Sequence, residues 1–126
     1  MSRMSAPAPL LSLVIPAYNE AERLPLTLPA VIAFLDAQPY GVELILVNNN
    51  SRDDTHRVAA EFAATREYIR VLDEPVQGKG AAVRTGMLAA AGEYLFMADA
   101  DFSMPVEEIA KFLPPNLSQY DVAIGS

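Results

Sequence analysis

Residues 43–66, "ELILVNNNSRDDTHRVAAEFAATR", contain in one run the unit from which the predicted fold is built. The run begins as a continuous apolar strand and ends as a helix in which Val58, Ala59 and Phe62 face inward. Ser51, in the polar turn between them, is well placed to cap the helix. A strand that leads through a short polar loop into a helix is typical of α/β proteins.

The same alternation recurs along the whole chain. Strands are predicted at residues 10–15, 43–48, 68–73, 93–99 and 121–126. Helices are predicted at residues 21–37, 52–66, 78–92 and 106–112, the third closed by Gly92. Continuous apolar strands fit a parallel sheet with both faces covered. The predicted class is therefore α/β, a Rossmann-like, open, mostly parallel sheet with helices on both faces. Because a strand ends the chain, we interpret the domain as truncated.

Composition and charge limit the possible functions. A chain of 126 residues with 52% hydrophobic content suits one domain, expected at residues 10–126 after a flexible lead-in at residues 1–9. A net charge of -7 disfavours nucleic acid and accommodates a bound cation more easily. The absence of cysteine excludes disulfides and a thiolate nucleophile, and it fits a cytoplasmic location. No apolar run is long enough for a membrane helix.

Each of the first four predicted strands ends in a polar cluster: "PAYNE", "NNNSRDD", "DEPVQGKG" and "DADFS" in chain order. In an open parallel sheet, ligands bind outside the carboxyl ends of the strands, near the point where strand order reverses. The four loops are therefore expected to form a single site. His56, within the second predicted helix, is expected to lie away from this rim as a surface or boundary histidine.

Asp99 and Asp101 form the most informative pair in these loops. Residues i and i+2 of an extended segment point the same way, so the two carboxylates would repel each other without a cation or hydrogen-bond donors between them. Oxygen ligands without cysteine favour Mg²⁺ or Mn²⁺, which bind one or two carboxylates plus substrate phosphates. The alternative is an aspartate turn that merely closes a strand.

The stretch "QGKGAAVRTG" predicts an anion site. Gly78 and Gly80 let the backbone approach a ligand at a helix N-terminus, where free N–H groups favour an anion. Lys79 adds a positive charge suited to a diphosphate, whereas Arg84 is either a site residue or a surface charge. The spacing matches neither a P-loop nor G-x-G-x-x-G.

The first two loops offer groups suited to a nucleoside. Pro16 rigidifies the strand exit, Tyr18 offers a flat face and a hydroxyl, and Glu20 is either a ligand acceptor or an acid at a helix start. Asn48 offers an acceptor for a base N–H. The alternative is that the run of three asparagines is simply a turn.

Together, "VIPAYNE", "ELILVNNNSRDDT", "GKGAAVRTGM" and "MADADFSMP" resemble the nucleotide-sugar-binding half of family 2 glycosyltransferases, which have the GT-A fold. In order and spacing they are most similar to the polyprenyl-phosphate sugar transferases. The resemblance covers nearly everything from Leu10 to Ser126. It implies an inverting, metal-dependent enzyme with a UDP- or GDP-sugar donor and a polyprenyl-phosphate acceptor at a membrane surface, as in cell envelope glycan biosynthesis. It also implies that acceptor-binding parts, absent from this chain, hold the protein at the inner face of the membrane.

The resemblance also implies roles for individual residues. Pro16, Ala17, Tyr18 and Glu20 would hold the nucleoside, and Asn48 would contact the base. Asp99 would contact the ribose side and the metal, Asp101 would bind the metal that bridges the diphosphate, and Lys79 or Arg84 would assist the leaving group. The family often has D-D-G-S where this chain has N-N-N-S, so the base contact falls to a neutral amide.

Two rival functions come from other classes. A non-catalytic nucleotide-binding or regulatory domain is compatible with the asparagine turn and the missing half. A phosphotransferase of the haloacid-dehalogenase type is disfavoured, because its D-x-D follows the first strand of the core and here it follows the fourth. On either enzymatic or regulatory reading, the chain alone is expected to bind nucleotide and to transfer little or no sugar. The sugar, the base and the oligomeric state are not predicted.

Overall fold

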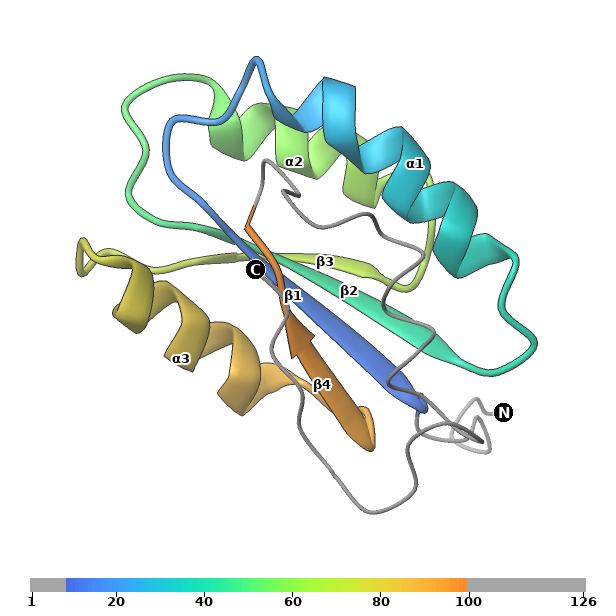
Figure 1. The fold of residues 1–126 in the computed structure, drawn as a ribbon. Helices are drawn as coiled ribbons and strands as arrows, with labels where there is room; N and C mark the ends of the chain where they lie inside the picture. The colour runs from blue at the N-terminus through green and yellow to red at the C-terminus, as the bar shows by residue number, and fades with distance from the viewer. Residues whose placement is uncertain (1–8, 100–126) are drawn as a thin grey trace, which may run out of the picture.

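The structure is a computed structural model that describes residues 9–99, and these form one parallel sheet flanked by helices (Figure 1). The strands are β1 (Leu11–Ala17), β2 (Val42–Asn48), β3 (Ile69–Asp73) and β4 (Tyr94–Met97). The helices are α1 (Leu24–Asp36), α2 (Thr55–Ala63) and α3 (Lys79–Ala89). The predicted strand at residues 121–126, the predicted helix at residues 106–112 and Asp101 lie outside the described residues. The expected domain bounds, residues 10–126, stay a prediction.

All neighbouring strands of the sheet pair in parallel, in the order β3-β2-β1-β4. The chain therefore adds β2 and β3 on one side of β1 and then crosses to the other side for β4. Strand order reverses between β1 and β4, and this is where open α/β sheets bind ligands.

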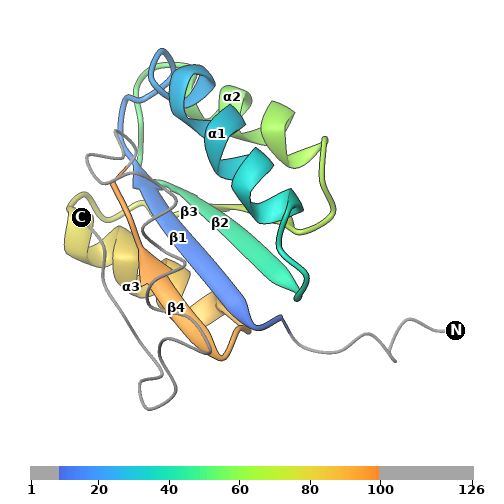
Figure 2. The same cartoon turned by 45° about the vertical axis from the view of Figure 1, so that its right-hand side comes forward.

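Helices cover both faces of the sheet, as predicted (Figures 1 and 2). Alternate residues of β1 serve opposite faces, because side chains along a strand alternate. Leu13 and Ile15 belong to the larger core cluster with α1 and α2, whereas Val14 belongs to a smaller one with Ala82 of α3. The continuous apolar runs in β1 and β2 follow from this double coverage.

Ser51 does not cap α2, so that prediction is wrong. The helix begins at Thr55, and Asp54 occupies the cap position without a side-chain cap hydrogen bond. Asp53 stabilises the start of α2 instead, because its carboxylate accepts a hydrogen bond from the Thr55 N–H at 2.9 Å. The Ser51 hydroxyl accepts one from the Asn19 N–H at 3.0 Å, which ties the loop after β2 to the loop after β1.

Gly92 does not close α3, which is a second correction. The helix ends at Ala89, and the next residue already has extended geometry. The Gly92 N–H donates to the Ser12 hydroxyl at 2.8 Å, and a Cβ at this position would lie 2.6 Å from the same oxygen. Glycine is therefore required by the close approach of this turn to β1.

A buried carboxylate holds the turn between α3 and β4. Glu43 is 8% exposed, and it accepts hydrogen bonds from the Ser12 hydroxyl at 2.7 Å, the Ala91 N–H at 3.0 Å and the Arg70 guanidinium at 3.0 Å. Burial raises the pKa of Glu43, but the hydrogen bonds from Ala91, Ser12 and Arg70 outweigh it and hold the pKa below its ordinary value. The ionised carboxylate is thus part of the folded state.

We expect Glu43→Gln to lower the free energy of unfolding by about 2 kcal/mol at pH 7, because a neutral amide cannot accept from all three donors. A depressed folded-state pKa gives stability that is present above the unfolded value of about 4.3 and is lost as the pH falls through the folded value. Urea unfolding at pH 7 and pH 3 measures this, with the exposed Glu93→Gln as the control. A deficit equal at both pH values would contradict the assignment.

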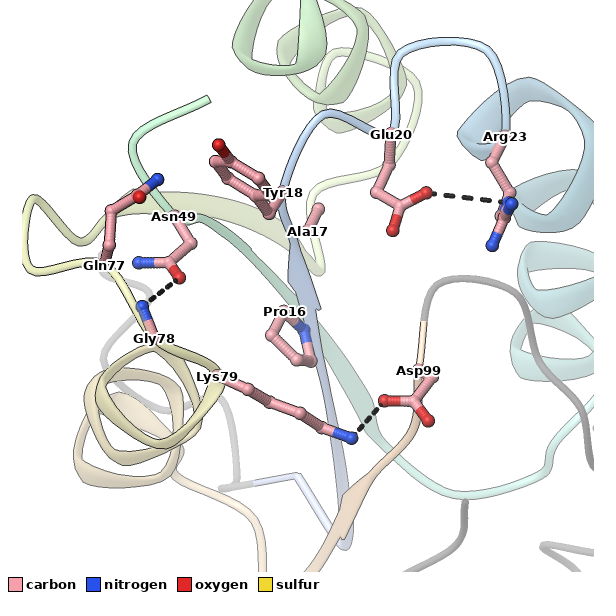
Figure 3. Close-up of a pocket in the computed structure, with 10 residues that line it drawn as sticks. All are labelled: Pro16, Ala17, Tyr18, Glu20, Arg23, Asn49, Gln77, Gly78, Lys79 and Asp99. Atoms are coloured by element: carbon pink, nitrogen blue, oxygen red, sulfur yellow. Dashed lines mark hydrogen bonds and ion pairs between the residues drawn. The ribbon is translucent and has the colours of Figure 1, made fainter. Parts of the chain in front are cut away.

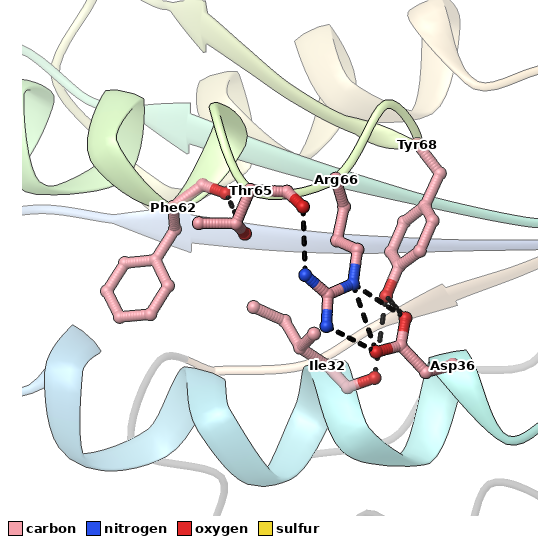
Figure 4. A network of polar contacts seen from close by, with 6 residues as sticks. All are labelled: Ile32, Asp36, Phe62, Thr65, Arg66 and Tyr68. Carbon is pink, nitrogen blue, oxygen red and sulfur yellow. Dashed lines mark hydrogen bonds and ion pairs between the residues drawn. The ribbon is translucent and has the colours of Figure 1, made fainter.

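A polar network ties the end of α1 to the segment before β3 (Figure 4). The Asp36 carboxylate accepts hydrogen bonds from the Arg66 guanidinium, the shortest at 2.6 Å, and from the Tyr68 hydroxyl at 2.6 Å. The hydrogen bonds from Arg66 and Tyr68 hold the pKa of Asp36 below its ordinary value. These residues lie at the amino-terminal edge of the sheet, so they stabilise the end opposite the strand exits.

Candidate functional site

A pocket of about 400 Å³ lies at the carboxyl ends of β1 and β4, where strand order reverses (Figure 3). Its volume is in the range of small-molecule sites. It is lined by Pro16, Ala17, Tyr18, Glu20, Arg23, Asn49, Gln77, Gly78, Lys79 and Asp99. The loops after β1, β2, β3 and β4 all contribute, so the predicted convergence of these loops is confirmed within residues 9–99.

The β1 exit forms one side of the pocket. Pro16 and Ala17 end the strand, and Tyr18 follows with 42% of its surface exposed. An aromatic ring this accessible beside a pocket offers a stacking face for a planar ligand. Glu20 and Arg23 lie further along the wall, with the Glu20 carboxylate oxygen 3.6 Å from Arg23 Nε (Figure 3). This side presents both charges and an aromatic face.

Opposite charges meet on the other side of the pocket. Lys79, the first residue of α3, places its Nζ 2.5 Å from Asp99 Oδ1 in the segment after β4 (Figure 3). The first N–H groups of any helix lack intrahelical partners, so the start of α3 adds donors beside the lysine. The arrangement suits a ligand that carries both an anionic group and a bound cation.

The segment before α3 has a fixed shape. The Glu74 carboxylate accepts hydrogen bonds from the Val76 N–H at 2.9 Å and from the Thr85 hydroxyl. The hydrogen bonds from Thr85 and Val76 hold the pKa of Glu74 below its ordinary value. Gly78 has φ +133° and ψ 134°, a conformation open in practice to glycine, and no heavy atom lies within 4 Å of the place of a Cβ. Glycine is needed here for backbone geometry rather than for space.

Comparison with known proteins assigns the chain to a family. The sequence profile described as "Glycosyl transferase family 2" matches residues 12–126. The chain belongs to glycosyl transferase family 2. It is 38% identical over 135 residues to a dolichyl-phosphate beta-glucosyltransferase of Drosophila melanogaster, a match that covers 96% of this chain and 41% of that protein. The chain therefore spans about two fifths of the length of this curated relative.

Solved structures of glycosyltransferases share the fold. A mannosyltransferase from Pyrobaculum calidifontis, in complex with GDP-Man and Mn²⁺, aligns with a TM-score of 0.68 at 23% identity, over 87% of this chain and 34% of that one. Glucosyl-3-phosphoglycerate synthase from Mycobacterium tuberculosis, in complex with UDP, aligns with a TM-score of 0.64 at 26% identity, over 87% and 40%. The predicted GT-A fold is confirmed by these likenesses.

The pocket of this family 2 chain gathers most of the predicted site residues. Those that line it are Pro16, Ala17, Tyr18, Glu20, Lys79 and Asp99. Their roles in binding stay predictions. Arg84 is exposed on α3 and is not among the lining residues, and Asp101 lies outside the described residues.

Asn48 lies at the same rim but outside the pocket lining. Its Nδ2 donates to Asp73 Oδ1 at 2.9 Å, and the same oxygen lies 2.9 Å from His56 Nδ1. Within the described part of the chain, Asn48 Oδ1 is buried without a hydrogen-bond partner. Its contact with a base stays a prediction. His56 lies nearer the rim than predicted, because α2 begins late and turns its first residues toward the end of β3.

The oxygen ligands at the pocket suit a hard divalent cation. Asp99 brings a carboxylate to the pocket beside the start of α3, and no cysteine is present to favour a softer metal. Within residues 9–99 no group of three or more histidine, cysteine, aspartate or glutamate residues is gathered for a metal. Mg²⁺ commonly binds through one or two carboxylates plus substrate phosphates, so the two carboxylates of the pocket lining, Asp99 and Glu20, are compatible with it.

Sequence reasoning missed Arg23, Asn49 and Gln77 as lining residues. For Asn49 a usable signal exists. Side chains alternate along β2, and Val47 faces α3, so the second residue after it is directed to the same side. Arg23 and Gln77 carry no comparable signal, because their positions depend on the path of irregular loops.

Proposed function

We propose that the chain is the donor-binding part of a metal-dependent, inverting glycosyltransferase that uses a UDP- or GDP-sugar. The observation that carries the proposal is the pocket at the strand-order reversal, where Lys79 and the start of α3 face Asp99. Family membership supports it, as do the fold relatives in complex with GDP-Man and Mn²⁺ or with UDP.

In this proposal, different residues of the chain bind different parts of the nucleotide-sugar donor. Tyr18 offers its face to the base, beside Pro16 and Ala17. Lys79 and the first N–H groups of α3 bind the diphosphate, and they stabilise the charge that it gains as the acceptor oxygen attacks the anomeric carbon and the bond from that carbon to the diphosphate breaks. Asp99 and Asp101 hold Mg²⁺ or Mn²⁺, which when bound supplies Lewis-acid neutralisation of the leaving diphosphate.

The proposed acceptor is a polyprenyl phosphate at a membrane surface, in keeping with the dolichyl-phosphate relative. The second ionisation of a phosphate monoester lies near pH 6, so the acceptor is mostly deprotonated at neutral pH and needs no protein base. None of the helices in residues 9–99 is long and apolar enough to cross a membrane. A cytoplasmic location, at the inner membrane face, and a role in cell envelope glycan synthesis belong to the same proposal.

A second candidate is a non-catalytic nucleotide-binding domain. The asparagine turn favours it, because Asn48 stands where the family often has an aspartate, and its amide pairs with Asp73 outside the pocket lining. Sugar transfer separates the two candidates. We expect the 126-residue chain to bind nucleotide but to transfer little sugar, since it spans 41% of its Drosophila relative. A longer form of the protein that also fails to transfer from UDP- or GDP-sugars would favour the second candidate.

Calorimetric titration of UDP, GDP, CDP and ADP, with and without Mn²⁺, tests the donor site. We expect one nucleotide to bind in a Mn²⁺-dependent manner and to lose about tenfold or more in affinity in Asp101→Ala. The reason is that this carboxylate would hold the metal. Asp54→Ala, an exposed aspartate at the start of α2, is the control. Binding that is unaffected by Mn²⁺ and by Asp101→Ala would refute the metal-dependent site.

A further inference from the structure

Asn49, directly after β2, is hydrogen-bonded to the end of β1 and to the segment before α3. It is 5% exposed, and its backbone N–H donates to the Ala17 carbonyl at 2.8 Å. Its side-chain Nδ2 donates to the carbonyls of Glu74 at 3.1 Å and Val76 at 2.8 Å, and its Oδ1 accepts from the Gly78 N–H at 3.0 Å (Figure 3). The side chain therefore satisfies three backbone groups of residues 74–78, which we call the α3-entry loop.

Only a carboxamide fits this set of partners. Asn49 must donate two hydrogen bonds and accept one, and a carboxamide has both donors and an acceptor. An ionised carboxylate only accepts, so an aspartate here would face the carbonyls of Glu74 and Val76 with two acceptors. Because buried polar groups without partners are costly, the α3-entry loop would have to move.

The shape of the α3-entry loop determines where the ammonium group of Lys79 lies. Gly78 is the residue before α3, and its N–H is the group that Asn49 holds. Lys79 follows at once, with Nζ at the pocket and 2.5 Å from Asp99. Glu74 fixes the far end of the loop through Val76 and Thr85, so Asn49 fixes the end next to α3.

We propose that Asn49 is a positioning residue for the donor diphosphate. It holds the α3-entry loop so that Lys79 and the first N–H groups of α3 meet the phosphates, and it does not touch the base. The inference rests on the proposed donor-binding function. It separates the two neighbouring asparagines: Asn48 lies on the α2 side beside Asp73 and His56, and Asn49 acts on the phosphate side.

The test compares nucleoside diphosphates with monophosphates. Affinities of UDP, UMP, GDP and GMP are measured with Mg²⁺ for the unmodified chain, Asn49→Ala and Asn49→Asp. Asn50→Asp is the matched control, because it adds the same charge at the next residue, which is exposed and has φ +56°, a geometry aspartate tolerates. Hydrogen exchange of the Gly78 amide without nucleotide gives a second readout.

We expect both Asn49 variants to bind the preferred diphosphate about tenfold more weakly, which is the lower end of the loss seen when a group that orients a metal ligand is removed. Affinity for the monophosphate should change by less than about twofold, and Gly78 should exchange faster. Asn50→Asp should leave the two affinities and the Gly78 exchange rate unchanged. An equal loss for monophosphate and diphosphate would overturn the inference, because it indicates general damage to the fold.

Two further outcomes would also overturn it. A loss confined to Asn49→Asp would indicate charge repulsion instead of positioning, and unchanged Gly78 exchange in both variants would show that Asn49 does not hold the loop. Failure of the proposed function is distinguishable, because it appears in the unmodified chain. If that chain binds none of the four nucleotides, the proposed function fails and the inference fails with it.

Discussion

Gly86→Val is expected to lower the free energy of unfolding by at least about 3 kcal/mol, the upper range for overpacking a core. A Cβ at Gly86 would lie 2.3 Å from Val14 Cγ1 and 3.1 Å from Val47 Cγ2, and both valines are fully buried. α3 would have to move away from β1 and β2. Since a domain of this kind has about 5–15 kcal/mol in total, the loss is a large share of its stability.

Gly80→Ala is the matched control on the same helix. No heavy atom lies within 4 Å of the place of a Cβ at Gly80, and its φ is not in the left-handed region. Alanine is the better helix former, so this variant should be unchanged or more stable by about 0.5 kcal/mol. Urea unfolding at pH 7 compares the two. A Gly86→Val protein within about 1 kcal/mol of the unmodified chain would contradict the close packing of α3.

Lys79→Glu is expected to weaken binding of the preferred nucleoside diphosphate at least about 100-fold, since like charges brought together cost several kcal/mol. The new carboxylate would face Asp99, where Lys79 now forms an ion pair at 2.5 Å, and it would repel the incoming phosphates. Calorimetric titration with Mn²⁺ measures the loss. Lys79→Met, which removes the charge without reversing it, should lose less.

Arg84→Glu gives the informative comparison, because it is the same charge reversal elsewhere on α3. Arg84 is exposed and does not line the pocket, so its reversal should weaken binding by less than about fivefold, a screened surface effect. A loss as large as that of Lys79→Glu would make Arg84 a site residue, which is one of the two roles that the sequence left open. A negligible effect of Lys79→Glu would remove the lysine from the proposed donor site.

Strand and helix periodicity predicted the elements of residues 9–99 well, because the spacing of apolar residues shows which face of each element is buried. Helix ends were predicted less well. Ser51 and Gly92 have the residue types of caps, yet each has a partner distant in sequence, Asn19 and Ser12 respectively. Local propensity contains no information about such contacts. A prediction from it therefore assigns both residues to the nearest helix end.

The position of the pocket was predicted through a rule about sheets rather than through single residues. Polar loops at the strand ends had to converge, and Pro16, Lys79 and Asp99 do so. The difference between Asn48 and Asn49 was not accessible in the same way. Three consecutive asparagines look alike in sequence. Alternation along β2 gives the side to which Asn49 is directed, but only the path of residues 74–78 shows which groups it contacts.

The most direct test of the central claim, that the donor binds at the strand-order reversal, is backbone amide NMR of the ¹⁵N-labelled 126-residue chain titrated with UDP and with GDP in Mg²⁺. The largest shifts are expected at Tyr18, Asn49, Gly78, Lys79 and Asp99, the residues around the pocket. Little change is expected at the opposite edge of the sheet, around Asp36, Arg66 and Tyr68. Largest shifts at that edge, or none at millimolar nucleotide, would contradict the account.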